Sequence, residues 1–121
     1  MCLSYHVSFR VKVEGIDKYI PVGDCDANIT YNVNNIIRKS TGLPWDNGIN
    51  NGYCKDVIPK IKIGYDELCR NPEKYKEYEA ENGWGTVDGT KRFFRKIIAA
   101  WDELRYYEDY DLAEVATFWI T

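Results

Sequence analysis

Apolar and polar residues alternate strictly near the start of the chain, between residues 5 and 13. The apolar positions are Tyr5, Val7, Phe9, Val11 and Val13, and the polar positions between them are His6, Ser8, Arg10 and Lys12. This period of two predicts an antiparallel strand with one buried face. A turn at Glu14-Gly15 then leads to a second, shorter strand at 18–22, so that the two strands form a hairpin. Pro21 lacks an amide donor, which places the second strand at a sheet edge or ends it there.

A different period governs the segment from residue 87 to 107. Apolar or small residues recur there every three or four positions, which is typical of a helix with one face on the core. These positions are Val87, Thr90, Phe94, Ile97, Ile98, Trp101 and Leu104. The segment is predicted to be the longest helix of the protein. A glycine-hinged loop over 82–86 leads into it.

Between the hairpin and this helix, the pattern predicts two further helices and a short helical segment. The first helix begins at a cap formed by Asn28 or Thr30 and runs to about Ser40, where Gly42 ends it. The second covers 57–70 with Pro59 in its first turn, and a polar helical turn or two follows at 73–81. The loop at 43–52 contains Trp45. This side chain either packs into the core and pins the loop there, or is exposed for a binding partner; we expect it to pin the loop to the core.

Residues 115–120 are rich in β-branched and aromatic side chains and predict a last strand. Because both of its faces are apolar, we expect an inner strand next to the first one. The predicted order is β-β-α-α-α-β. We therefore expect a single α+β domain over 1–121, in which a small antiparallel sheet, made of the N-terminal hairpin and the C-terminal strand, is covered on one face by about three helices.

Composition narrows the functional classes. A net charge of −3 argues against a duplex nucleic-acid partner, which normally meets a basic face. Aromatic residues make up 15% of the chain, which suits an exposed binding surface, an oligomer interface or simply a core. The open sheet favours a homo-oligomer. No apolar run is long enough for a membrane span and no leader is apparent, so we expect a cytoplasmic protein in the host cell.

The residues offer little for catalysis or for metal binding. The four cysteines have no CxxC spacing and the single histidine, His6, is expected on the exposed polar face of the first strand. Cys25 lies between Asp24 and Asp26, whose charges raise the pKa of its thiol and disfavour a nucleophile. The two aspartates, with Asp46, Asp56 and Asp88 in predicted loops, leave a magnesium site open as an alternative. We expect no cofactor, no catalytic residue and no metal.

Two helix-start stretches carry the binding prediction. In the first, Asn28, Thr30, Tyr31 and Asn32 offer polar contacts beside helix amides that attract anions. In the second, glycines let backbone amides approach a ligand and an indole offers a stacking face; the residues are Gly83, Trp84, Gly85 and Thr86. The cations Lys91, Arg92 and Arg95 follow on the outer side of the long helix. The alternative is that these residues have structural roles only. Asn28 and Thr30 would then cap a helix, the glycines would permit a turn, and Trp84 would fill the core.

These stretches also carry a resemblance. The ordered set Asn28-Ile29-Thr30-Tyr31-Asn32-Val33, Asn71-Pro72-Glu73-Lys74-Tyr75 and Glu81-Asn82-Gly83-Trp84-Gly85 resembles a family of small proteins encoded by phages and prophages of Gram-positive bacteria. The chain departs from that pattern in its asparagine-rich loop at 43–53 and in its extended hairpin. The resemblance implies an accessory factor that counters host defence by stoichiometric binding.

Three functions follow as hypotheses. The first is a non-enzymatic protein that sequesters a small phosphate-bearing, nucleotide-like ligand, with the residues above as its site. The second is an inhibitor that docks on a host defence protein through its tyrosines and the acidic stretch 108–114. The third is a small metal-dependent hydrolase that uses Asp24, Asp26 or Asp88.

Overall fold

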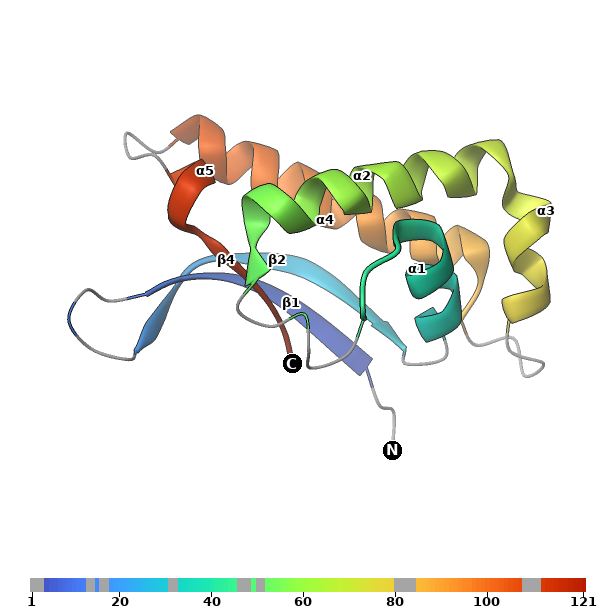
Figure 1. Cartoon of the computed structure of the whole chain (residues 1–121), viewed down its shortest axis with the longest axis horizontal. Helices are drawn as coiled ribbons and strands as arrows, with labels where there is room; N and C mark the ends of the chain where they lie inside the picture. Colours follow the sequence, from blue (N-terminus) through green and yellow to red (C-terminus); the bar gives the residue numbers. More distant parts are fainter. Residues whose placement is uncertain are drawn as a thin grey trace.

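The chain folds into an antiparallel sheet with helices on one face, as Figure 1 shows. The computed structural model describes residues 4–12, 15, 18–30, 33–45, 49, 52–79, 85–107 and 112–121, and only the backbone of 4, 5, 23–30, 105–107, 112 and 113. The strands are β1 (Ser4–Lys12), β2 (Tyr19–Thr30), β3 (Gly52–Tyr53) and β4 (Thr117–Ile120), in the order β2-β1-β4-β3. The helices are α1 (Asn34–Thr41), α2 (Cys54–Arg70), α3 (Pro72–Tyr75), α4 (Val87–Tyr107) and α5 (Leu112–Val115), and a 3₁₀ turn covers Lys76–Tyr78. The predicted α+β class is confirmed.

The alternation in the first strand decides which face of the sheet is covered. Val7 and Phe9 are buried, while His6, Ser8 and Arg10 are half-buried on the opposite face. The helices all lie on the buried side in Figure 1, so the polar side of the sheet faces outward. β4 pairs with both β1 and β3, which confirms the expected inner strand. β2 lies at an edge, as Pro21 predicted.

Aromatic rings fill the layer between the sheet and the helices. Phe9 meets Trp101 of α4 edge-on, with ring centroids 5.4 Å apart. Trp45 is fully buried and contacts Phe93 at 5.9 Å and Phe118 at 5.8 Å. The expectation that Trp45 pins its loop to the core is therefore confirmed.

The predicted long helix is also confirmed. Its apolar stripe faces inward, since Val87, Phe94, Ile97 and Trp101 are buried. Gly42 ends α1 in the left-handed conformation at φ 75°, as a C-terminal glycine does.

Three elements differ from the prediction. α2 begins at Cys54, so Pro59 lies inside the helix instead of in its first turn. The Cys54 amide donates to the Ala116 carbonyl at 2.9 Å, and this bond to the residue before β4 sets the earlier start. The last segment also divides: Leu112–Val115 forms the short helix α5 before β4 begins at Thr117. The short strand β3 lies in the stretch predicted as loop.

The buried Tyr75 hydroxyl makes the fold less stable as the pH becomes alkaline. It donates to Glu67 Oε1 at 2.9 Å. Burial is the larger cause, and the Glu67 carboxylate the smaller, of a rise in the pKa of Tyr75 to about 12. In the unfolded chain tyrosine ionises near pH 10. The contribution of Tyr75 is therefore complete below about pH 10 and is lost as pH rises toward about 12.

We expect the stability advantage of the wild type over Tyr75→Phe to shrink across that pH window. Denaturant unfolding of both proteins at a series of pH values measures this difference, and the other tyrosines and the lysines cancel in the comparison. Two pH profiles that run parallel through the window would contradict the assignment.

Candidate functional site

The first predicted stretch is a strand and not a helix start. Asn28 pairs with His6 and Thr30 with Ser4, within β2. α1 begins at Asn34 with Val33 at its N-cap and no side-chain cap bond. The prediction that Asn28 or Thr30 caps a helix is therefore wrong. Backbone pairing with β1 outweighs the capping tendency of these residues. Tyr31 and Asn32 lie outside the described residues.

The second stretch does begin a helix. Gly85 has φ 89°, a conformation that favours glycine, and Thr86 follows as the cap. The Gly89 amide donates to Thr86 Oγ1 at 3.0 Å, and the Thr90 amide donates to the Thr86 carbonyl at 3.0 Å. The Thr86 hydroxyl therefore has a structural role as a cap, and its contact with a ligand stays a prediction. Gly83 and Trp84 lie outside the described residues.

The predicted cations share the outer face of α4, but two of them have partners. Lys91 Nζ lies 3.5 Å from Asp88 Oδ1, and Arg95 Nη2 donates to the Tyr65 hydroxyl at 3.3 Å. Arg92 is exposed. Figure 1 places the start of α4 and the end of β2 at the same end of the molecule. The described parts of the two stretches, the end of β2 and the start of α4, therefore lie at one end of the molecule.

A second arrangement, which the sequence did not predict as a site, lies on the open face of the sheet. Arg10 of β1 stacks on Trp119 of β4, with the guanidinium carbon 4.7 Å from the ring centroid. Tyr19 of β2 lies against the same indole, with ring centroids 5.1 Å apart and planes tilted by 59°. Three strands thus contribute one side chain each to a cationic aromatic stack. We refer to Arg10, Tyr19 and Trp119 as the sheet-face stack.

Hydrogen bonds across the strands fix this stack. Trp119 Nε1 donates to Thr117 Oγ1 at 2.8 Å, and that hydroxyl donates to the Arg10 carbonyl at 2.7 Å. Thr117, at the centre of this relay, is buried, whereas Trp119 and Arg10 are half-buried. The indole is held in place before any ligand arrives, which lowers the entropy cost of binding.

Two members of the stack, Arg10 and Tyr19, line a shallow recess of about 320 Å³. Its lining residues are His6, Ser8, Arg10, Tyr19, Pro21 and Thr121. His6 and Thr121 exchange backbone hydrogen bonds at 2.8 and 2.9 Å. His6 is half-buried, whereas the sequence predicted an exposed side chain. Ser8 Oγ is buried and has no hydrogen-bond partner among the described residues. The volume lies at the small end of ligand pockets, which are about 300–1,000 Å³.

No described carboxylate neutralises the charge of Arg10. Within the described part of the chain, Arg10 forms no ion pair, and its guanidinium stacks on the Trp119 indole. A guanidinium whose N–H donors lack an acidic partner recognises phosphate or carboxylate oxygens. The recess therefore combines an aromatic face, a cation and polar groups.

The residues of the other two hypotheses are only partly described. Among the described residues, no three His, Cys, Asp or Glu side chains meet in a way that could hold a metal ion. The side chains of Asp24 and Asp26 lie outside that description, and Asp88 pairs with Lys91. Of the acidic stretch, Glu114 is exposed and pairs with Lys55, whereas 108–111 lie outside the described residues. Both hypotheses stay predictions.

Searches against protein-family models, curated proteins and solved structures find no match to this chain. No helix in the described ranges is long and apolar enough to cross a membrane. The geometry of the two surfaces is thus the basis for a functional proposal.

Proposed function

We propose that this is a non-enzymatic binding protein of phage or prophage origin that counters a host defence by sequestering a small nucleotide-like ligand. The observation that carries the ligand class is the sheet-face stack beside the recess. The family resemblance of the sequence supports the biological context. The helix-start residues remain the alternative location for the same ligand.

The chemistry of a nucleotide suits this surface in two respects. A base is planar, and stacking on an aromatic side chain contributes about 1–3 kcal/mol per base. A phosphate accepts from guanidinium donors, and Arg10 lies in the middle strand between Tyr19 and Trp119. The exposed Lys12 follows on the same strand and adds charge at that end. In the proposed mode the phosphate lies toward Arg10 and Lys12, and the sugar lies toward His6 and Ser8.

We expect Arg10→Gln to weaken nucleotide binding by at least tenfold. A hydrogen bond to a charged group contributes about 1.5–3 kcal/mol, and each 1.4 kcal/mol is tenfold in affinity. The measurement is isothermal titration with nucleoside monophosphates, nucleoside triphosphates and cyclic nucleotides. The matched control is Arg92→Gln, which removes the same charge from an exposed position on α4 and should change the affinity less than threefold.

The same titration separates the two locations. If Arg92→Gln or Trp84→Ala weakens binding and Arg10→Gln does not, the ligand lies at the helix-start stretches. If the wild type binds no nucleotide, the proposed ligand class is wrong. Thermal unfolding of each variant shows whether a lost affinity reflects a lost fold.

A further inference from the structure

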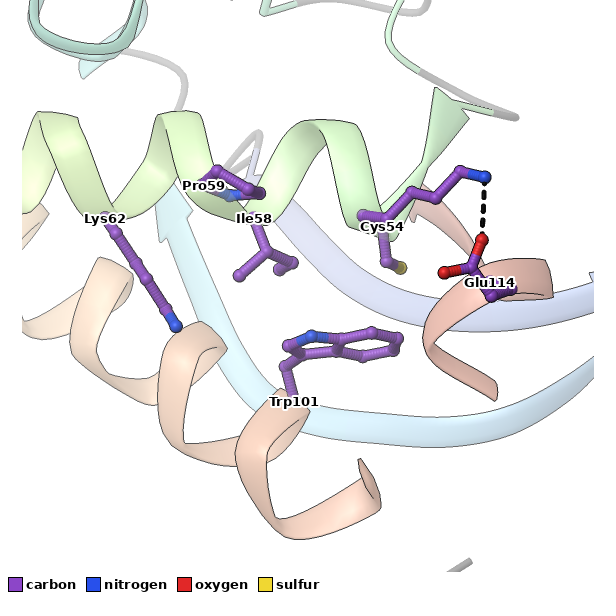
Figure 2. A pocket seen from close by; sticks show the side chains of 7 residues that line it. Cys54, Ile58, Pro59, Lys62, Trp101 and Glu114 are labelled. Atoms are coloured by element: carbon purple, nitrogen blue, oxygen red, sulfur yellow. Dashed lines mark hydrogen bonds and ion pairs between the residues drawn. The ribbon is translucent and has the colours of Figure 1, made fainter. Parts of the chain in front are cut away.

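A second, separate cleft lies on the helical side of the molecule. It is bounded by the start of α2, the second half of α4 and α5, and has a volume of about 210 Å³ (Figure 2). Its lining residues are Cys54, Lys55, Ile58, Pro59, Lys62, Trp101 and Glu114. None of them belongs to the sheet-face stack or to the recess beside it. This volume is below the usual range of ligand pockets, about 300–1,000 Å³, so the cleft suits a compact ligand.

Two hydrogen-bond donors in this cleft have no protein acceptor among the described residues. Trp101 is 3% exposed, and its ring packs edge-on against Phe9. Within the described residues, neither its indole N–H nor the Lys62 ammonium has a hydrogen bond or ion pair. Figure 2 shows the indole nitrogen on the side of the ring that faces Lys62. Both donors are therefore available to an acceptor that binds in the cleft.

The charges of the lining residues favour an anion. Glu114 is the one carboxylate among them, and its Oε2 lies 3.0 Å from Lys55 Nζ. In Figure 2 this ion pair lies at the end of the cleft away from Lys62. Since Lys55 and Glu114 neutralise each other, the described lining residues keep one positive charge, that of Lys62. A single negative charge on the ligand would match it.

The remaining walls are apolar. Ile58 and Pro59 of α2 lie above the indole in Figure 2, and the Cys54 side chain points toward the ring from the start of the helix. Pro59 has no amide to donate, so it adds an apolar surface and no hydrogen-bond donor. Ligand atoms between Ile58, Pro59 and the ring would be held by dispersion and by loss of water contact.

We infer that this cleft binds a compact monocarboxylate with an apolar body. The carboxylate accepts from the Lys62 ammonium and the Trp101 indole N–H, while the body packs on Ile58 and Pro59. This site is independent of the proposed nucleotide binding, because the two surfaces share no lining residue.

The test is a titration of the ¹⁵N-labelled protein with benzoate and with hexanoate, followed through the indole N–H signals. Trp101→Phe assigns the Trp101 signal by its loss. We expect both carboxylates to shift that signal saturably, because the indole N–H gains an acceptor. Lys62→Met keeps the aliphatic stem and removes the charge, and it should weaken both at least tenfold. The control Lys60→Met changes an exposed lysine of the same helix outside the cleft and should leave affinity unchanged.

Benzamide, which has the shape of benzoate without its charge, tests the carboxylate requirement. The inference predicts clearly weaker binding of benzamide than of benzoate. It is overturned if neither carboxylate shifts the Trp101 signal, if Lys62→Met binds them as the wild type does, or if benzamide binds equally well. Unfolding curves of Lys62→Met and Lys60→Met confirm that both variants are folded.

Discussion

We expect Trp45→Ala to lower the free energy of unfolding by about 3–5 kcal/mol, the usual cost of removing a buried indole. Trp45 is fully buried between Phe93 of α4 and Phe118 of β4, so its loss leaves a cavity between the helical layer and the sheet. Arg38 Nη2 also donates to the Trp45 carbonyl at 3.0 Å, which ties the loop to α1. A domain of this size has about 5–15 kcal/mol of stability in total, so the variant should be near the limit of folding.

Urea unfolding followed by far-UV circular dichroism measures this effect without relying on the indole. Trp45→Phe keeps an aromatic ring in the same place and should cost clearly less than Trp45→Ala. Tyr53→Ala removes a ring that is 49% exposed and should change stability by less than about 0.5 kcal/mol. An unfolding midpoint of Trp45→Ala equal to that of the wild type would mean that the loop is not anchored by its tryptophan.

We also expect Gly64→Ala to destabilise the protein by about 1–3 kcal/mol, the usual cost of overpacking. In most helix interiors the change from glycine to alanine stabilises by roughly 0.5–1 kcal/mol, so the sign of the effect is the test. A Cβ at position 64 would clash with Thr41 Cγ2 of α1 and lie 3.3 Å from Phe94 Cε2 of α4.

Thr41 cannot easily turn its methyl group away from this clash. Its hydroxyl donates to the Ile37 carbonyl at 2.6 Å and accepts from the Leu43 amide at 3.0 Å. Thr41→Ser keeps that hydroxyl and removes only the methyl group. The double variant with Gly64→Ala should therefore recover most of the lost stability in the same unfolding experiment. If Gly64→Ala alone stabilises the protein, α1 and α2 are not packed as closely as the structure shows.

Several elements could be predicted because a single period governs each of them. The alternation in β1 and the stripe along α4 extend over enough residues to fix both the element and its buried face. The position of β4 beside β1 followed from apolar residues on both of its faces. In each case the local pattern and the tertiary packing require the same structure.

Other elements depend on contacts that no local pattern encodes. Asn28 and Thr30 favour a helix cap by residue type, but pairing with β1 extends β2 through them. Gly64 looks like a weak point of a helix until α1 is seen to pack against it. The early start of α2 depends on a bond from Cys54 to Ala116, at the far end of the chain.

The candidate site, too, could be predicted from the sequence only where it depends on a local pattern. Loop composition and basic residues predicted the stretch before α4, where Gly85 and Thr86 do form a helix start. The sheet-face stack joins Arg10, Tyr19 and Trp119 from three strands, and only the strand order brings them together. The available signal was an aromatic residue in the last strand, on the face where the first strand is polar.

The most direct test of the central claim follows the four indole N–H signals of the ¹⁵N-labelled protein during titration with the tightest nucleotide of the panel. Single Trp→Phe variants assign the signals. Binding at the sheet-face stack predicts a saturable shift of the Trp119 signal, with little change at the buried Trp45. If the Trp119 signal stays in place while Trp84 moves, or if no indole signal moves at saturating nucleotide, the open face of the sheet is not the ligand-binding surface.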